Sequence, residues 1–206
     1  MELTSESFVD GARADDRLAL CVPGSQNPVE FGENRSPHLR WEPVEGGLSY
    51  VVTCIDPDCP SVGDDVNQSD REVPASLPRV DFVHWLLADI PPSVTEIAEG
   101  THSAGLTAGG KDADASPVGV PGRNDYTDWF ADDAALAGTW VGYDGPAPPW
   151  NDSIVHRYVF TVRAMDVPTL HLAPGFDLAA LVGALDGHVL DEASISTSYT
   201  LTPRLR

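Results

Sequence analysis

LSYVVTCI, residues 48–55, is a run of β-branched, aromatic and apolar residues that ends at Asp56 and Pro57. Two further runs have the same character: DFVHWLLADI, residues 81–90, which two prolines follow, and VHRYVFTVRAM, residues 155–165. Short runs so rich in β-forming residues, bounded by turn residues, predict buried strands rather than helices. We therefore expect three core strands at these positions.

The chain around these strands is divided into short elements. Its 206 residues include 18 glycines and 18 prolines spread throughout, which favours a mostly β architecture over a helical bundle. Residues 61–80 are polar, acidic and proline-bearing, and predict an exposed excursion between the first two strands. Residues 108–125 predict another loop, and residues 129–137 one or two helical turns. The length fits one domain, residues 1–206.

One longer helix is expected near the carboxyl end, over residues 178–190. Asp177 stands where an N-cap residue would, and apolar residues then recur at helical spacing: Leu178, Leu181, Val182, Leu185 and Val189. Two glycines inside this segment weaken it by about 1 kcal/mol each relative to alanine. Packing of the leucine face onto the sheet is therefore expected to hold the helix.

Composition predicts a soluble cytoplasmic protein. No apolar run approaches the roughly 20 residues of a membrane-spanning helix. The amino terminus carries acidic and polar residues where a secretory signal would be basic and then apolar. The three cysteines, Cys21, Cys54 and Cys59, are an odd number, which favours free thiols in a reducing compartment. Their spacing matches no zinc ribbon, so we expect no metal there.

The charge balance narrows the range of partners. Twelve basic residues against 32 acidic ones give a formal net charge of −20. Such a surface repels nucleic acids and anionic membranes, so we expect neither nucleic-acid binding nor stable membrane insertion. The same charge opposes an anionic ligand, although salt screens charges that lie beyond roughly 8 Å.

Polar side chains stand at the ends of the three expected strands. On the third strand, His156 and Tyr158 project to one face, because successive strand residues alternate. On the second, alternation predicts that His84 shares its face with Phe82 and Leu86. Each histidine is thus a lone polar group among apolar neighbours. By itself, such a histidine is more often a hydrogen-bonded core residue than part of a site.

Two acidic residues, Asp56 and Asp58, lie just past the end of the first strand, between prolines that limit the freedom of the backbone. If the three strand ends meet, two imidazoles and a phenol offer convergent donors, while a carboxylate orients one imidazole. A carboxylate beside a histidine also favours the charged imidazole. The combination suits an anion such as phosphate. Taken alone, the Asp-Pro sequence usually indicates only a turn.

Six segments together resemble the signature of the phosphatidylethanolamine-binding protein family, in its bacterial Raf kinase inhibitor-like branch. They occur in the order of the family and extend over nearly the whole chain. Each match alone is weak, and their order makes the resemblance specific. The segments are LTSESFVDG at 3–11, SPHLRW at 36–41, DPDCP at 56–60, VHW at 83–85, GPAPP at 145–149 and HRY at 156–158.

The resemblance implies an antiparallel β-sandwich with a few peripheral helices and a small anion-binding cavity at one edge. It implies no cofactor, and it suggests a homodimer. Arg157 is expected to point away from the cavity and to form a structural ion pair. The positions that match the family's pocket are Asp56, Asp58, His84, His156 and Tyr158, with Gly145 on the loop that closes one side.

The sequence departs from the family pattern in two places. The excursion at residues 61–80 is longer than expected, and could shield or reshape the entrance of the pocket. Between GPAPP and HRY, the segment WNDSIV lacks the usual glycines, which puts the backbone contribution of this loop to an anion site in doubt.

The function expected from these residues is reversible binding of a phosphate or phosphorylated head group, without catalysis. A protein that inhibits a kinase or protease through residues 61–80 is the alternative. A hydrolase with His84 or His156 as base and Asp56 as its orienting partner is less favoured, because no Gly-x-Ser-x-Gly elbow is present. A metal site built from the same residues is equally disfavoured.

Overall fold

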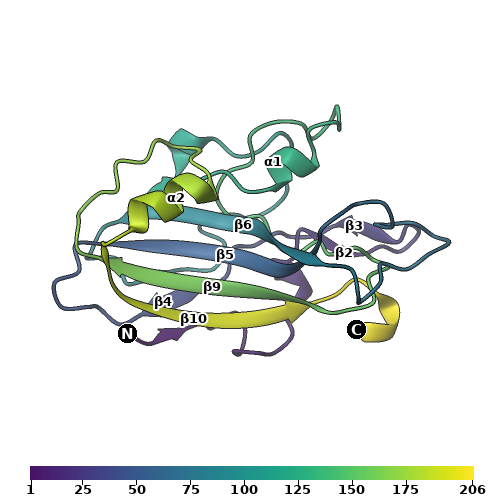
Figure 1. Cartoon of the computed structure of the whole chain (residues 1–206), viewed down its shortest axis with the longest axis horizontal. Helices are drawn as coiled ribbons and strands as arrows, with labels where there is room; N and C mark the ends of the chain where they lie inside the picture. Colours follow the sequence, from purple (N-terminus) through teal and green to yellow (C-terminus); the bar gives the residue numbers. More distant parts are fainter.

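The computed structural model describes residues 1–206 and contains three antiparallel sheets (Figure 1). The largest has the strand order β10-β9-β5-β6-β8, and the others are β1-β4-β7 and β2-β3. The strands are β1 Leu3–Thr4, β2 Cys21–Pro23, β3 Val29–Phe31, β4 Leu39–Trp41, β5 Ser49–Pro60, β6 Arg79–Ile90, β7 Glu96–Ile97, β8 Val120–Pro121, β9 His156–Met165 and β10 Val189–Tyr199. The helices are α1 Tyr126–Trp129 and α2 Leu178–Leu185, with short 3₁₀ turns at Asp16–Leu18, Ala113–Ala115 and Pro203–Leu205.

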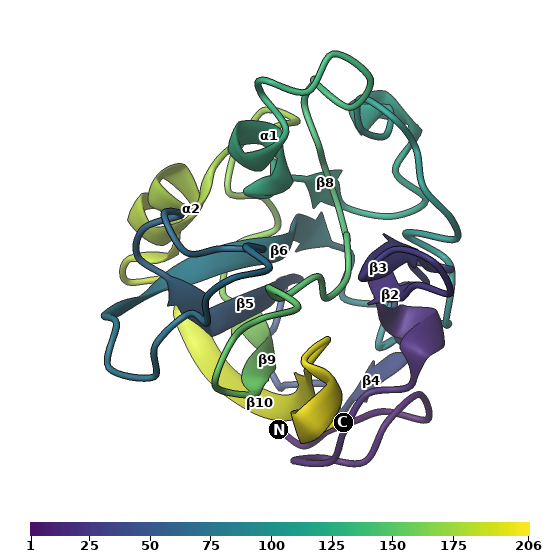
Figure 2. The same cartoon turned by 90° about the vertical axis from the view of Figure 1, so that its right-hand side faces the viewer.

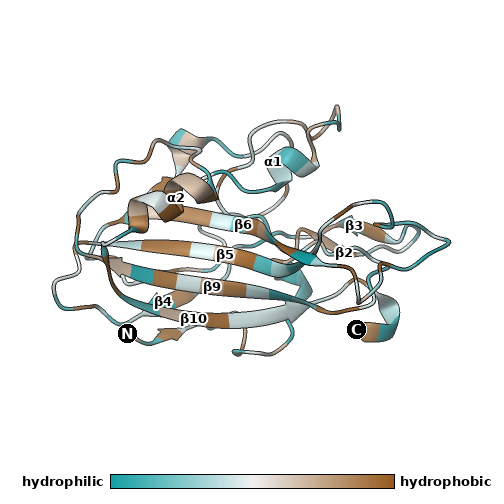
Figure 3. Ribbon diagram, viewed as in Figure 1, coloured by the Kyte–Doolittle hydropathy of each residue, from teal (hydrophilic) through white to brown (hydrophobic).

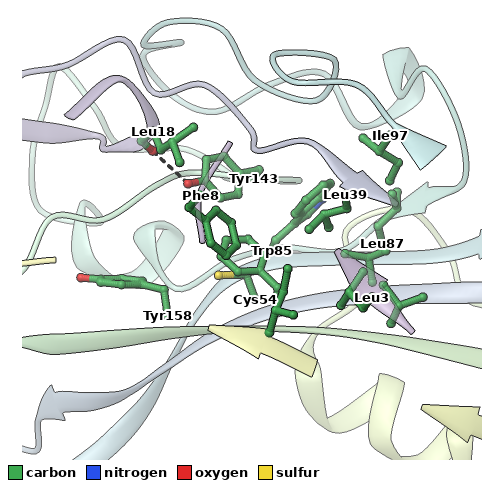
Figure 4. Close-up of a cluster of buried hydrophobic side chains, with 14 of the residues drawn as sticks. Leu3, Phe8, Leu18, Leu39, Cys54, Trp85, Leu87, Ile97, Tyr143 and Tyr158 are labelled. Atoms are coloured by element: carbon green, nitrogen blue, oxygen red, sulfur yellow. Dashed lines mark hydrogen bonds between the residues drawn. The ribbon is translucent and has the colours of Figure 1, made fainter. Parts of the chain in front are cut away.

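The predicted antiparallel β-sandwich with few helices is confirmed. Its main core is a cluster of 22 buried residues between the five-stranded sheet and the sheet that contains β4 (Figure 2). Leu3 and Leu39 enter this core from the smaller sheet, and Trp85 and Leu87 from β6 (Figure 4). Each sheet is apolar on its inner face, so both must be buried against one another.

The three predicted core strands are β5, β6 and β9, which lie side by side in the large sheet. The end predicted for the first strand is wrong, because β5 continues through the Asp-Pro-Asp segment to Pro60. Its pairing with β9 stops at Ile55, and its register with β6 shifts between Asp56 and Cys59. Prolines fit there because a bulged strand end has ladder positions that need no N–H donor.

The predicted C-terminal helix begins where expected but is shorter. The carboxylate of Asp177 accepts a hydrogen bond from the amide of Ala180 at 2.9 Å, which caps the amino end of α2. The helix ends at Leu185, because Gly187 has a φ of 78° and turns the chain into β10. Leu181 is fully buried on the outer face of the large sheet, as its place on the leucine face predicts.

The helical turns predicted over residues 129–137 are also misplaced. The helix α1 ends at Trp129, where that segment begins. Beyond it, the carboxylate of Asp133 accepts hydrogen bonds from the amides of Ala135 and Leu136 at 2.8 and 3.2 Å. An aspartate that binds the amides following it stabilises a turn in competition with a helix.

Polar residues gather at one end of the large sheet. The strands β5 and β9 are apolar along their middles and hydrophilic at the ends that lie nearer the C-terminus (Figure 3). Four of the six expected site residues belong to these ends: Asp56 and Asp58 on β5, and His156 and Tyr158 on β9. No helix of the chain combines the length and apolar character needed to cross a membrane.

Candidate ligand-binding site

The late part of β5, the early part of β6 and the start of β9 surround a cavity of about 200 Å³. Asp56, His84, His156 and Tyr158 all line it, so the structure brings together four of the six expected site residues. The strands also contribute Cys59, Pro60 and Phe82. The remaining walls come from the excursion after β5, from α1 and from the loop before β9: Ser61, Val62, Gly63, Val66, Asn67, Tyr126, Trp129, Ala147, Pro148 and Pro149.

His84 is directed to the cavity by an irregularity in the sheet. Cys54 pairs with Trp85, whereas the next residue, Ile55, pairs with Val83, so His84 is the extra residue of a β-bulge. A bulge re-aims one side chain and interrupts the alternation of faces. The prediction that His84 shares its face with Leu86 is therefore wrong, because Leu86 packs in the cluster beneath α2.

Nδ1 of His84 lies 2.7 Å from the carbonyl oxygen of Asp144. A carbonyl can only accept, so Nδ1 carries the proton and, in the neutral ring, Nε2 is an acceptor. Burial lowers the pKa of His84, outweighing the nearby carboxylate of Asp56 and the carbonyl of Asp144, so the ring is neutral near pH 7. Nε2 makes no hydrogen bond within the protein.

His156 has no free nitrogen. Its Nδ1 lies 2.7 Å from Oδ2 of Asp56, and its Nε2 lies 3.0 Å from Oδ2 of Asp152. Burial by itself lowers the pKa of His156, but the hydrogen bonds and charges of Asp152 and Asp56 outweigh it and raise the pKa to about 9. His156 is therefore an imidazolium held between two carboxylates. The expectation that two imidazoles grip one anion is wrong for this ring.

Arg79 extends this arrangement into a chain of four alternating charges. Its guanidinium binds both oxygens of Asp152, at 2.6 and 3.0 Å. Burial raises the pKa of Asp152, but hydrogen bonds from His156 and Arg79 outweigh it, so the net shift is downward. The series from Asp56 through His156 and Asp152 to Arg79 has no net charge. Sequence reasoning missed Asp152 and Arg79. The signal available was an aspartate four residues before His156, within the segment that departs from the family pattern.

The neighbouring residue, Asn151, fastens the excursion. Its Nδ2 donates to the carbonyl oxygens of Asp65, Gln68 and Arg71 at 2.8, 3.1 and 2.9 Å, and its Oδ1 accepts from the amide of Asn67 at 2.9 Å. Residues far apart in sequence thus form one unit at the end of the sheet that faces the viewer in Figure 2.

The excursion at residues 61–80 forms one wall of the cavity. Its side chains Val62 and Val66 line the cavity, with Trp129 of α1 also on the wall. The excursion therefore contributes to the lining of the cavity, and its effect on the entrance relative to the family stays a prediction. Two side chains of WNDSIV bind the excursion: Asn151 through the hydrogen bonds given above, and Ser153 through its hydroxyl, which donates to the carbonyl oxygen of Val73 at 2.7 Å.

Asp58 does not line the cavity. Its two carboxylate oxygens accept from Nε and a terminal nitrogen of Arg157 at 2.9 and 3.0 Å. Burial would raise the pKa of Asp58, but the hydrogen bonds and charge of Arg157 lower it. The expected ion pair of Arg157 is thus present, and Asp58 is its partner instead of a cavity residue.

Gly145 also lies behind the wall. A Cβ at this position would sit 2.0 Å from the carbonyl oxygen of Leu18, so only glycine fits there. Its amide donates to Oδ1 of Asn34, and its carbonyl accepts from the hydroxyl of Tyr126. The wall itself is formed by the next residues of the loop, 147–149.

Tyr158 supplies a hydroxyl without a partner. The residue is 1% exposed, and its hydroxyl makes no hydrogen bond. In Figure 4 this hydroxyl points away from the core side chains, whereas that of Tyr143 donates to the carbonyl oxygen of Leu18 at 2.9 Å. The rings of Tyr158 and His84 lie edge to face, 5.0 Å apart. Burial raises the pKa of Tyr158 well above its usual value, so the phenol stays protonated.

The family model described as phosphatidylethanolamine-binding protein matches residues 4–200. The chain belongs to this family. Among its relatives are a UPF0098 protein of Methanothermobacter thermautotrophicus, 35% identical over 97% of this chain and 98% of that protein, and the UPF0098 protein YbhB of Escherichia coli, 30% identical over 97% and 100%.

Solved structures of phosphatidylethanolamine-binding protein relatives share the fold. CT736 of Chlamydia trachomatis superposes with a TM-score of 0.62 at 25% identity, covering 96% of this chain and 95% of that one. YbcL of Escherichia coli gives 0.67 at 24% identity, covering 97% of each chain. The family and the fold support a binding protein.

Proposed function

We propose that this chain is a non-catalytic protein that reversibly binds a small phosphate-bearing or other anionic head group in the cavity beside His84. The observation that carries the proposal is the buried hydroxyl of Tyr158, which lies next to His84 and lacks a partner. Leaving a buried hydroxyl unpaired costs about 1–3 kcal/mol, which an acceptor oxygen of a ligand recovers. The name of the family agrees with a phosphorylated head group.

Proton uptake accompanies the binding of a phosphate dianion. Neutral His84 offers an acceptor at Nε2, so an oxyanion binds there only if this nitrogen gains a proton, or if the ligand brings a P–OH group that donates to it. A bound anion raises the pKa of His84, which burial otherwise lowers. Affinity for phosphate therefore increases as pH falls.

The other charges near the cavity do not prevent the binding of an anion. Asp56 lines the cavity, but its carboxylate is neutralised by the imidazolium of His156 at 2.7 Å and also accepts from the amide of Asp58 at 2.7 Å. The excursion adds apolar surface through Val62 and Val66. The cavity thus suits a small ligand with an anionic end and an apolar body.

Three features support a role without catalysis. His156 cannot act as a base, because both ring nitrogens are bound by carboxylates. Cys59 lines the cavity, but burial, with help from nearby carboxylates, raises its pKa to about 12, so the nucleophilic thiolate is absent. Ser61 also lines the cavity and makes no hydrogen bond to either histidine.

The exposure of the excursion supports the alternative, an inhibitor of a kinase or protease, since Val62 at the entrance is 50% exposed. Removing residues 64–72 should abolish inhibition if this alternative is right. If inhibition depends on the excursion alone, the intact chain should inhibit a kinase or protease equally well when His84 is replaced.

The binding proposal is tested by calorimetry and by NMR of the histidine rings, with inorganic phosphate and phosphorylethanolamine as probes. We expect saturable shifts of the His84 ring and tighter binding at pH 6 than at pH 8. Tyr158→Phe should weaken binding about 10- to 100-fold, the worth of one hydrogen bond to a charged group. Tyr143→Phe is the matched control and should bind as the wild type does. Unchanged His84 resonances at millimolar ligand, or full affinity in Tyr158→Phe, would overturn the proposal.

A further inference from the structure

A second cavity, of about 240 Å³, shares no lining residue with the first. It lies among the loops between β7 and β8 and the segment after α1, and residues 100–105, 111–112, 115–117 and 141–142 supply most of its walls. Only three of its fifteen lining residues are hydrophobic. The hollow is therefore polar, and it is smaller than the roughly 300–1,000 Å³ of pockets for drug-sized ligands.

Two buried side chains on its wall lack partners. Oγ of Ser103 and Nε2 of His102 make no hydrogen bond, although the residues are only 5% and 7% exposed. The ring of His102 lies 5.3 Å from that of Trp85 between centroids, and its side chain makes no hydrogen bond. Each unpaired buried group costs about 1–3 kcal/mol. Two of them in one wall indicate a site that a hydrogen-bonding occupant completes.

Lys111, the only lysine of the chain, also lines this cavity. Its Nζ lies 2.7 Å from Oδ1 of the fully buried Asp144, whose oxygens also accept from the side-chain amides of Asn34 and Asn124. An ammonium has three N–H donors, and only one of those of Lys111 is used. Two donors on a fixed side chain remain for an occupant.

The walls carry little net charge. The charge of Lys111 is matched by that of Asp144. Burial, assisted by the charge of Lys111, lowers the pKa of His102 to about 4, so this ring is neutral near pH 7. Asp112 on the rim adds a negative charge, as does the overall balance of −20. An anion gains nothing here, whereas a hydroxyl group can both donate and accept.

From the unpartnered Ser103 and His102 and the spare donors of Lys111, we infer that this second cavity binds a small uncharged polyhydroxylated molecule, of the size of a polyol or a monosaccharide. The hydroxyl groups of the ligand accept hydrogen bonds from Lys111. They also donate to, or accept from, the side chains of Ser103 and His102. Nothing in this site depends on the head-group binding proposed for the first cavity.

The test is a titration of the intact chain with glycerol and with glucose, followed through backbone amide NMR shifts. Saturable shifts are expected at residues 101–105 and 111 at tens of millimolar probe. Ser103→Ala should weaken binding about fivefold, since each neutral hydrogen bond is worth about 1 kcal/mol, and it should not harm folding because the hydroxyl is unpaired. Ala115→Leu, at an exposed position of the wall, should block the cavity.

Tyr158→Phe, in the first cavity, is the control and should leave these shifts unchanged. Absence of saturable shifts with both probes would overturn the inference. So would equal binding by the wild type and Ala115→Leu, or a stronger response of residues 101–105 to sulfate than to either probe.

Discussion

Nε2 of His156 lies 3.0 Å from Oδ2 of Asp152, four residues earlier in the chain, and both side chains are about 1% exposed. The contact turns the start of β9 and the loop before it into one charged unit, which Arg79 completes from the start of β6. It removes His156 from direct ligand binding and gives the ring a structural role. The candidate site therefore rests on one free imidazole, that of His84.

Asp152→Asn should destabilise the protein by about 3–5 kcal/mol. The substitution leaves the buried His156 and the largely buried Arg79 with one negative charge fewer, and breaking a buried ion pair on one side has a cost of this size. Urea unfolding measures it. Asp58→Asn is the control, because its partner Arg157 is 62% exposed, and it should cost about 1 kcal/mol or less. Equal costs for both variants would contradict the structural role of Asp152.

Stability should decline on the alkaline side. The pKa of His156 is raised from 6.5 to about 9, so its contribution is complete below pH 6.5 and is lost as pH rises through about 9. The shift corresponds to roughly 3 kcal/mol. Free energies of unfolding measured at intervals between pH 6 and pH 10 should show this loss. His156→Gln, destabilised at pH 6, should have a much flatter profile, and a slope as steep as that of the wild type would refute the assignment.

Stability should also decline on the acid side, for the opposite reason. Burial lowers the pKa of His102 from 6.5 to about 4, so the unfolded chain takes up a proton first, and stability falls as pH drops from 6.5 towards 4. The lowered pKa of His84 acts in the same direction. Thermal unfolding between pH 7 and pH 4 should show a smaller decline in His102→Gln than in the wild type. The exposed His188 provides the control, as His188→Gln should follow the wild type.

Asn151→Ala should release the excursion at residues 61–80 while most of the sandwich stays folded. The amide of Asn151 donates to three carbonyl oxygens of this segment, and alanine leaves all three without this donor. Local opening then becomes easier, so amides of residues 66–73 should exchange with solvent about 10- to 100-fold faster. Limited proteolysis within the segment should accelerate as well. Asn27→Ala, at an exposed position, should change neither measurement.

Loss of the hydroxyl should change the stability of the protein differently at two buried tyrosines. Tyr158→Phe should leave the stability of the ligand-free protein unchanged or raise it by up to about 1 kcal/mol, because the deleted hydroxyl is buried and unpaired. Tyr143→Phe should cost about 1–3 kcal/mol, because the carbonyl of Leu18 loses its donor. Denaturant titrations without ligand give the free energies of unfolding of the two variants and of the wild type. A loss in Tyr158→Phe as large as that in Tyr143→Phe would show that its hydroxyl has a partner after all.

Much of the fold could be predicted from the sequence because its signals are local. The apolar runs of β5, β6 and β9 and the cap of α2 by Asp177 each lie within about ten residues. By contrast, β10 was not predicted, since VLDEASISTSY is largely polar and becomes a strand by pairing with β9 at the edge of the sheet. The end of α2 was misplaced for the same reason, because the chain leaves the helix to join that strand.

The sequence by itself determined the three core strands and, through the resemblance that its ordered motifs carry, the family and its sandwich, because strand periodicity and motifs are properties of neighbouring residues. The tertiary structure brought the strand ends together at the cavity. Only the tertiary structure decided which polar groups are free. Asp152 and Arg79 are 73 positions apart, and a one-residue bulge directs His84 to the cavity. Whether a buried nitrogen or hydroxyl can bind a ligand depends on which distant donors and acceptors already satisfy it, and local sequence does not encode those contacts.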